Sequence, residues 1–163
     1  MTGHDAATPF PHLTQSGDAR MVDVSGKETT TREAEAVGRV LLSPDCVRAL
    51  RDDTLPKGDA LAVARIAGIQ GAKLTPTIIP LCHPLMISKV DLEVTVTDEG
   101  CDIRSRVRVT GQTGVEMEAL TAVSCAALAL IDMVKAVDKN ARITDVRVVA
   151  KSGGRSGDWR DES

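Results

Sequence analysis

The chain has 163 residues and a formal net charge of −3, and this length is enough for one domain with a hydrophobic core. Because it contains one Phe, one Trp and no Tyr, it lacks the aromatic platforms on which single-stranded nucleic acids stack, and its acidic balance disfavours duplex DNA. No apolar run approaches the roughly 20 residues of a membrane span, no secretion signal opens the chain and no cysteines are spaced as CxxC, so we expect a cytoplasmic protein with reduced thiols.

The first third of the chain begins with little patterning. Residues 1–19 are polar, include two prolines and show no periodicity, so we expect a flexible N-terminal arm. Residues 21–25 (MVDVS) are predicted to form a short strand, and residues 33–43 a longer one. Between them, the basic and hydroxyl-rich patch from Lys27 to Arg32 is either a solvated edge or a contact for an anion.

Two helices are predicted next. Ser43-Pro44 is typical of a helix start, with Ser43 as the cap, and this short helix should end near Arg51. After a loop, a second and longer helix is expected over residues 57–73. Small side chains recur in it every four residues, which lets another element approach its backbone closely; they are Ala60, Ala64, Gly68 and Ala72.

Residues 75–85 (TPTIIPLCHPL) contain three prolines, which predict a rigid loop rather than a regular element. His83 lies in this apolar loop between Cys82 and Pro84. Loops often carry function on a rigid scaffold, so His83 is either a functional group or a buried histidine bonded to backbone.

Residues 90–97 and 101–110 both alternate strictly between apolar and polar side chains, which predicts a hairpin with one wet face. A two-residue turn at Glu99-Gly100 would set opposite charges across from one another. The expected cross-strand pairs are Glu93 with Arg106 and Asp91 with Arg108. The row of arginines is therefore expected to be structural.

Residues 114–139 are apolar and Ala-rich, and they are predicted to form one long helix. Glu116 and Glu118 stand at its start, where they suit the helix dipole, whereas Asp132 near its end does not. Asp132 and Lys135 share a face of this helix and can touch. Because roughly 21 Å separates Glu118 from Asp132 at 1.5 Å per residue, one small pocket cannot hold both ends, and a shared site would need a second chain.

A last strand is expected over residues 142–150, and the Gly- and Ser-rich basic tail, residues 151–163, is either disordered or an anion-binding flap. The element order βαββαβ predicts a single α+β domain over residues 20–150. Its expected fold is ferredoxin-like: an antiparallel sheet with two long helices on one face, plus the short helix and the N-terminal strand. The uncovered sheet face favours a homo-oligomer.

Six segments, in this order, resemble those of one known family. They are residues 21–32, 57–73, 80–85 (PLCHPL), 113–124 (TGVEMEALTAVS), 132–139 (DMVKAVDK) and 151–157 (KSGGRSG). Together they are similar to the MoaC family of molybdenum-cofactor biosynthesis, over roughly residues 13–158. Six long segments in order are far more specific than a short motif.

The resemblance implies a lyase, cyclic pyranopterin monophosphate synthase, acting on 3′,8-cyclo-7,8-dihydro-GTP with release of pyrophosphate. It also implies hexamers, trimers of dimers, with active sites at subunit interfaces. The catalytic residues that it implies are Asp132, Lys135, Lys57 and Lys73. The substrate-binding residues that it implies are Leu81, Cys82, His83, Met117, Glu118, Glu116, Arg32 and Lys151. No metal-ligand spacing occurs, so no protein-bound metal or other required cofactor is expected, while Mg²⁺ can accompany the triphosphate.

This chemistry suits the residue types. Several cations are needed to hold a triphosphate. Rebuilding a purine-derived ring needs repeated proton transfers, for which Asp132 beside Lys135 offers an acid–base pair, with Lys57 or Lys73 as a further proton carrier. The two glutamates near the start of the long helix would hold the pterin or orient the lysines.

Two other functions remain open at this point. One is a cysteine hydrolase with Cys82 as nucleophile and His83 as base, although neighbours in sequence rarely form such a pair. The other is a ferredoxin-like oligomer that senses a nucleotide without turning it over. That module would need the cations but not Asp132.

Overall fold

The computed structural model describes residues 13–162 apart from residue 15, so most of the expected N-terminal arm, residues 1–19, lies outside the described residues. The elements are β1 (Thr30–Leu41), α1 (Pro44–Arg51), α2 (Ala60–Ile78), β2 (Ile87–Val96), β3 (Gly100–Gly111), α3 (Glu116–Val134), β4 (Arg142–Ser152) and β5 (Trp159–Arg160).

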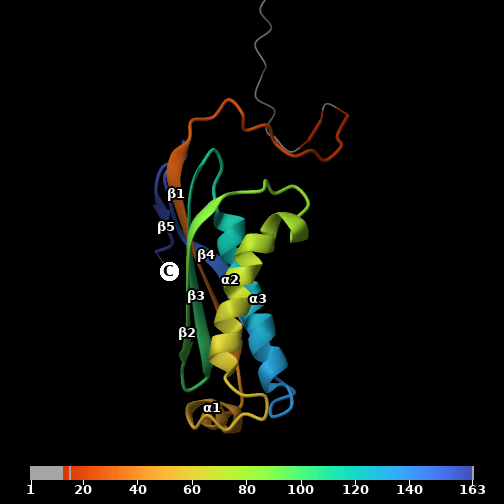
Figure 1. Cartoon of the computed structure of the whole chain (residues 1–163), viewed down its shortest axis with the longest axis vertical. Coiled ribbons are helices and arrows are strands. Elements are labelled where there is room, and N and C mark those ends of the chain that lie inside the picture. Colours follow the sequence, from red (N-terminus) through yellow and green to blue (C-terminus); the bar gives the residue numbers. More distant parts are fainter. Residues whose placement is uncertain (1–12, 15, 163) are drawn as a thin grey trace, which may run out of the picture.

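The strands form one antiparallel sheet in the order β2-β3-β1-β4-β5. Without β5, the long strands and the two long helices follow one another as βαββαβ, the split βαβ arrangement of a ferredoxin-like fold. Helices α2 and α3 lie together over one face of the sheet, and the short α1 lies at one end of the molecule (Figure 1). The predicted fold class is therefore confirmed.

The structure adds one strand to the ferredoxin-like set, but this strand is near the C-terminus and not at residues 21–25, the predicted position. Residues 21–25 do not form a strand: Ser25 donates from its backbone N and its Oγ to the carboxylate of Asp23, at 2.9 and 2.7 Å. Such local side-chain bonds compete with a sheet ladder. The added strand is instead β5, which pairs with the end of β4.

The small side chains on α2 form a packing surface, as predicted. Ala60, Ala64, Gly68 and Ala72 are buried. A Cβ atom on Gly68 would lie 2.8 Å from the backbone oxygen of Ala122 on α3, so glycine is what permits this close approach of the two helices.

Helix α3 forms the centre of the core. It ends at Val134 and is shorter than the predicted 114–139. Val123, Ala126 and Leu130 are fully buried. By length and composition alone α3 is apolar enough to cross a membrane, but 56% of its apolar stretch is buried in the fold, as expected for a core helix.

The prediction of a loop from residue 75 onward is wrong at its start, because α2 continues through Pro76 to Ile78. Pro76 has no N–H to bond the carbonyl of Ala72 one turn earlier. The buried hydroxyl of Thr75 donates to that carbonyl at 3.0 Å instead. This replacement bond lets the helix run one more turn and delays the loop that carries His83.

The hairpin is present, but its predicted register is wrong by two residues. Residues 97–99 connect the strands, with the N of Thr97 donating to the carbonyl of Gly100. The observed partners are Glu93 with Arg104 and Asp91 with Arg106.

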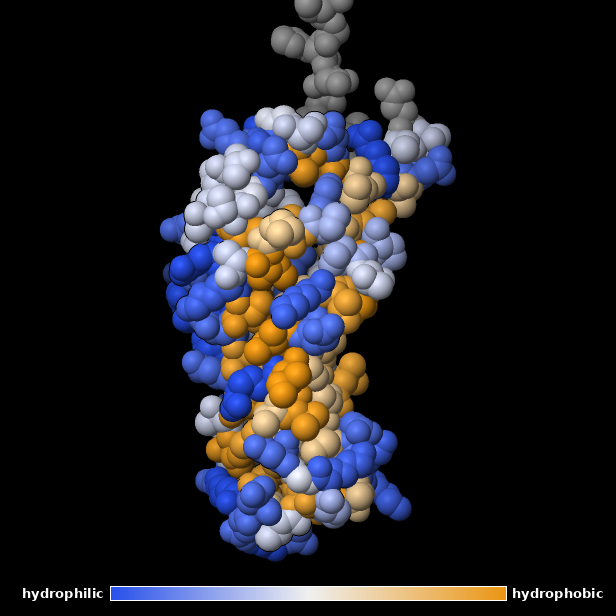
Figure 2. Space-filling view, in the orientation of Figure 1, coloured by the Kyte–Doolittle hydropathy of each residue, from blue (hydrophilic) through white to orange (hydrophobic). Residues whose placement is uncertain are grey.

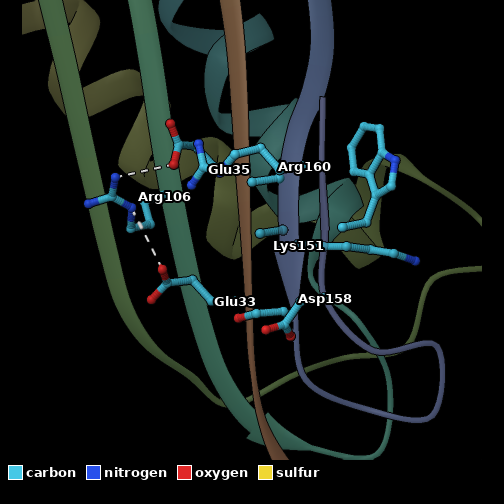
Figure 3. Close-up of a pocket in the computed structure, with 10 residues that line it drawn as sticks. Glu33, Glu35, Arg106, Lys151, Asp158 and Arg160 are labelled. Carbon is cyan, nitrogen blue, oxygen red and sulfur yellow. Dashed lines mark hydrogen bonds and ion pairs between the residues drawn. The ribbon is translucent and has the colours of Figure 1, made fainter. Parts of the chain in front are cut away.

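The arginines of β3 bind acids of β1 rather than those of β2. Glu35 is only 4% exposed, and its carboxylate accepts from Arg104 and Arg106. Glu33 binds Arg106 at 3.7 Å and Arg108 at 2.6 Å. Figure 3 shows Arg106 between the two glutamates on the sheet face away from the helices. The row is thus internally neutralised, in keeping with its expected structural role.

The carboxylate of Asp138 joins the end of the α3 region to the start of α1. It is 5% exposed and accepts from the backbone N of Ser43 at 2.6 Å and of Asn140 at 2.9 Å. Burial acts to raise the pKa of Asp138, but these bonds to the charged form outweigh it and leave the pKa below its ordinary value.

Replacing Asp138 with Ala should lower the free energy of unfolding by about 2–3 kcal/mol at pH 7, because two backbone N–H groups lose a charged and buried acceptor. Since folding lowers this pKa, the contribution is complete above the unfolded value of about 4 and declines as pH falls through the folded value. Urea unfolding at pH 7 and pH 3 measures both effects. The control Asp98→Ala removes only an exposed ion pair with Arg51; an equal loss in both variants would contradict the account.

Candidate functional site

All of the predicted site residues except Lys73 lie in two groups at opposite ends of α3. The helix-start cluster comprises Arg32, Leu81, Cys82, His83, Glu116, Met117, Glu118 and Lys151. The helix-end cluster comprises Lys57, Asp132 and Lys135. At 1.5 Å per residue, roughly 21 Å of helix separates Glu118 from Asp132.

Two ammonium groups bind one carboxylate in the helix-end cluster. Lys57 Nζ lies 2.8 Å from Asp132 Oδ2 and also donates to the Asp132 carbonyl at 2.9 Å, while Lys135 Nζ lies 2.7 Å from Oδ1. The bond from Lys135, followed by that from Lys57, lowers the pKa of Asp132 to about 2. Asp132 is therefore ionised at neutral pH, which suits it to hold the two lysines rather than to act alone as a base with a pKa near 7.

Lys73, the remaining predicted catalytic residue, belongs to neither cluster. Its side chain is exposed on α2 and makes no ion pair or hydrogen bond with the residues that the structure describes. It is thus available to a partner that the single chain does not supply.

A cavity of about 390 Å³ opens beside the start of α3. Its lining includes Leu81, Cys82 and His83 from the loop after α2, Glu116, Met117 and Glu118 from α3, and Val22, Val24 and Lys27 from the segment before β1. His83 Nε2 donates to the carbonyl of Val22 at 2.7 Å. Because a carbonyl can only accept, a neutral His83 carries its proton on Nε2 and keeps Nδ1 as an acceptor.

Glu118 is 3% exposed, and burial raises its pKa, with the charge of Glu116 adding to the effect and the N–H of its own residue opposing it. Burial, followed by the charge of Glu118, also raises the pKa of Cys82. A raised thiol pKa opposes thiolate formation, and in the described structure no hydrogen bond joins Cys82 to His83. These features count against the cysteine hydrolase.

Two further cavities adjoin the first one, and Lys27 lines all three. The larger, about 790 Å³, is walled by Lys27, Arg32 and Arg155 with Thr30 and Gly154. The smaller, about 120 Å³, lies between Lys27, Arg32, Glu116 and Lys151, where Lys151 and Glu116 are paired at 3.3 Å.

The cations around these cavities differ from those on the sheet face, because Lys27, Arg32 and Arg155 have no carboxylate partner among the described residues. The one side-chain bond of Arg32 goes from Nε to the carbonyl of Gly111 at 3.1 Å. The hydroxyl of Thr30 is buried there and also lacks a partner within the described structure. Unpaired cations around a cavity are the arrangement that binds an anion.

The tail folds back over this region. Gly153 and Gly154 have φ values of +82° and +76°, and the N of Gly153 donates to Asp158 Oδ1 at 3.1 Å. A Cβ on Gly154 would lie 2.2 Å from an Arg32 nitrogen, so this glycine leaves room for the guanidinium. The sequence singled out the basic patch and the tail but did not assign Lys27, Thr30 or Arg155 to a site; their proximity arises only from the fold.

Comparison with known proteins identifies the family of this chain. The model of the MoaC family matches residues 21–154. The chain belongs to the MoaC family. It is 61% identical over 158 residues to the cyclic pyranopterin monophosphate synthase of Streptomyces coelicolor, covering 97% of this chain and 93% of that protein.

Other MoaC relatives extend the likeness. A protein of the same name from Nocardioides is 60% identical and covers 95% of this chain and 97% of its own. Another protein of that name, from Chloroflexus aurantiacus, is 52% identical, and the match covers 96% of this chain and 97% of that protein. The predicted family is thus confirmed along nearly the whole chain, while the roles of individual residues stay predictions.

Glu118→Gln should stabilise the protein at pH 8 and leave its stability unchanged near pH 4. Folding raises the pKa of this acid, so the wild-type stability declines as pH rises through the folded value, whereas Gln stays neutral. Unfolding midpoints in urea at both pH values test this. Glu93→Gln, at an exposed position on β2, is the control and should show no such gain. A Glu118→Gln variant with no gain at pH 8 would contradict the raised pKa of Glu118.

Proposed function

We propose that this protein is a cyclic pyranopterin monophosphate synthase, a lyase of molybdenum-cofactor biosynthesis. It converts 3′,8-cyclo-7,8-dihydro-GTP to cyclic pyranopterin monophosphate and releases pyrophosphate. The observation that carries the proposal is the 52–64% identity, over at least 91% of this chain, to proteins of that name. The geometry of both clusters supports it.

The triphosphate binds among the unpaired cations. The cavity of about 790 Å³ is lined by Lys27, Arg32 and Arg155. Lys151 lines the small neighbouring cavity, which shares Lys27 and Arg32 with the larger one. No group of three or more His, Cys, Asp or Glu side chains that could hold a metal ion occurs in the described part of the chain. We therefore assign the phosphate charge to these side chains, with Mg²⁺ as a companion that the substrate itself can bring.

The pterin-forming end of the substrate contacts the cavity beside the start of α3. Leu81 and Met117 provide apolar contact there, and Cys82 and His83 provide polar atoms. The buried carboxyl of Glu118 lines this cavity and can accept hydrogen bonds from the donor edge of a guanine-derived ring. Glu116 forms an ion pair with Lys151 and so holds this lysine beside the same cavity.

Proton transfer belongs to the helix-end cluster. Asp132 fixes the ammonium groups of Lys57 and Lys135 within hydrogen-bonding distance of one carboxylate. A lysine that gains a buried anionic substrate as a neighbour can deliver and recover protons as the ring is rebuilt. Lys73 is a further proton carrier supplied from the exposed side of α2.

Formation of the cyclic phosphate is the step that releases pyrophosphate. A substrate hydroxyl attacks the innermost phosphorus, a new P–O bond forms, and the bond to the pyrophosphate oxygen breaks. The hydroxyl proton passes to a base, and cations such as Arg32 and Lys151 stabilise the charge that develops on the departing pyrophosphate.

A complete site needs more than one copy of the chain, because roughly 21 Å of helix separates the two clusters. The helix face has apolar side chains to bury in such an assembly. Figure 2 shows an apolar band along this face. The exposed apolar side chains of the two helices include Val63, Ile66, Leu74 and Ile78 on α2 and Leu128 on α3. We assign these to contacts in a cytoplasmic homohexamer, a trimer of dimers, with active sites at subunit interfaces.

The direct test is to incubate the purified protein with the cyclised GTP intermediate and measure pyrophosphate. Asp132→Asn should reduce release at least about 100-fold, because the lysines lose the charge that orients them. Lys73→Ala should do the same, whereas the exposed control Asp98→Asn should remain active. The native mass of each variant should stay near six times 17.2 kDa.

Normal release from Asp132→Asn or Lys73→Ala would overturn the roles given to those residues. A wild-type protein that binds the intermediate without releasing pyrophosphate would overturn the enzyme and favour the nucleotide-sensing module.

A further inference from the structure

We propose that Lys27 is a further anion-binding residue of this site and that Gln112 is the residue that positions it. The inference rests on the proposed function for the identity of the anion, the phosphate chain of the substrate. It goes beyond that function by naming a hydrogen-bonded clamp that holds the segment before β1 against the end of β3.

The clamp is a single side-chain amide. Gln112 directly follows β3 and is half-buried. Its Nε2 donates to the carbonyl of Lys27 at 3.1 Å and to the carbonyl of Ser25 at 3.3 Å. An amide nitrogen has two N–H donors, so both are directed to the backbone of one short turn.

The turn has no sheet to hold it. Residues 22–27 pair with no strand, and the turn closes through the N of Lys27 donating to the carbonyl of Val24 at 3.0 Å. The bond between His83 and the Val22 carbonyl secures one end of this segment. Gln112 secures the other end, at the backbone of Lys27, whose side chain must be oriented toward the anion.

Lys27 occupies a central place in the site. It lines the pterin-side cavity, the wide cationic cavity and the small cavity beside Glu116 and Lys151. Its ammonium forms no ion pair with the described residues, although thirteen ion pairs form elsewhere in that part of the chain. A cation that is left without an acid where three cavities meet is placed to bind an anion that spans them.

Positioning matters here because a lysine is a flexible point charge. Its long side chain has many rotamers, so anchoring the backbone of Lys27 restricts where the charge can reach before the ligand arrives. Loss of the clamp should weaken ground-state binding of phosphate groups more than it slows the proton transfers, which we assign to the Lys57–Asp132–Lys135 group.

Calorimetric titration of the full-length protein with inorganic pyrophosphate tests this without turnover. Lys27→Ala should weaken binding roughly 10-fold, as expected for one lost phosphate contact. Gln112→Ala should weaken it by a similar factor, and the double variant should be no weaker than Lys27→Ala alone, because Gln112 acts through Lys27. Gln112→Met keeps the approximate side-chain size, loses the donors and adds no charge, so it should behave like Gln112→Ala.

The matched control is Gln70→Ala, which removes an exposed amide from α2 and should bind pyrophosphate as the wild type does. With the cyclised GTP intermediate, Gln112→Ala should raise KM several-fold with little change in kcat. Wild-type pyrophosphate affinity in Gln112→Ala, or losses that multiply in the double variant, would overturn the inference. Clamp-dependent pyrophosphate binding in a protein that releases no pyrophosphate would sustain it while overturning the proposed enzyme.

Discussion

Helix α3 is a rigid rod that holds Glu118 and Asp132 roughly 21 Å apart, and the organisation of the site depends on that separation. The small-residue contact with α2, through Gly68, fixes the rod against the sheet. The segment after α3 is fixed by the buried carboxylate of Asp138, which accepts from the backbone N of Ser43 and of Asn140. Since neither end can move toward the other, the function that we propose needs a second copy of the chain to bring the two clusters together.

The positive side chains fall into a paired group and an unpaired group. On the open sheet face, guanidinium groups such as Arg106 are neutralised by the buried Glu35 and its neighbour Glu33. Around the cavities near the start of α3, Lys27 and Arg32 are left without acids among the described residues. The arginines on the sheet face are thus paired with carboxylates, whereas the cations around these cavities are not, and such an unpaired positive surface can attract an anionic ligand.

Sequence patterning was sufficient for the ferredoxin-like fold, because alternation and helical periodicity both survive in the structure. It failed where a single side chain changed a local outcome: the Thr75 hydroxyl let α2 pass Pro76, and Asp23 turned an expected strand into a turn. It also misjudged the hairpin register, since the acids that bind the arginines lie on β1. Lys27 and Gln112 gave no signal as a pair, because they meet only once β3 and the segment before β1 are placed together.

The most direct test of a site shared between chains is subunit exchange between two inactive variants. Glu118→Ala removes a residue at the start of α3, and Asp132→Ala removes one at its end. If each site takes its two clusters from different chains, an equal mixture that has exchanged subunits should regain about a quarter of wild-type activity. No recovery after exchange is demonstrated by mass would contradict the shared site.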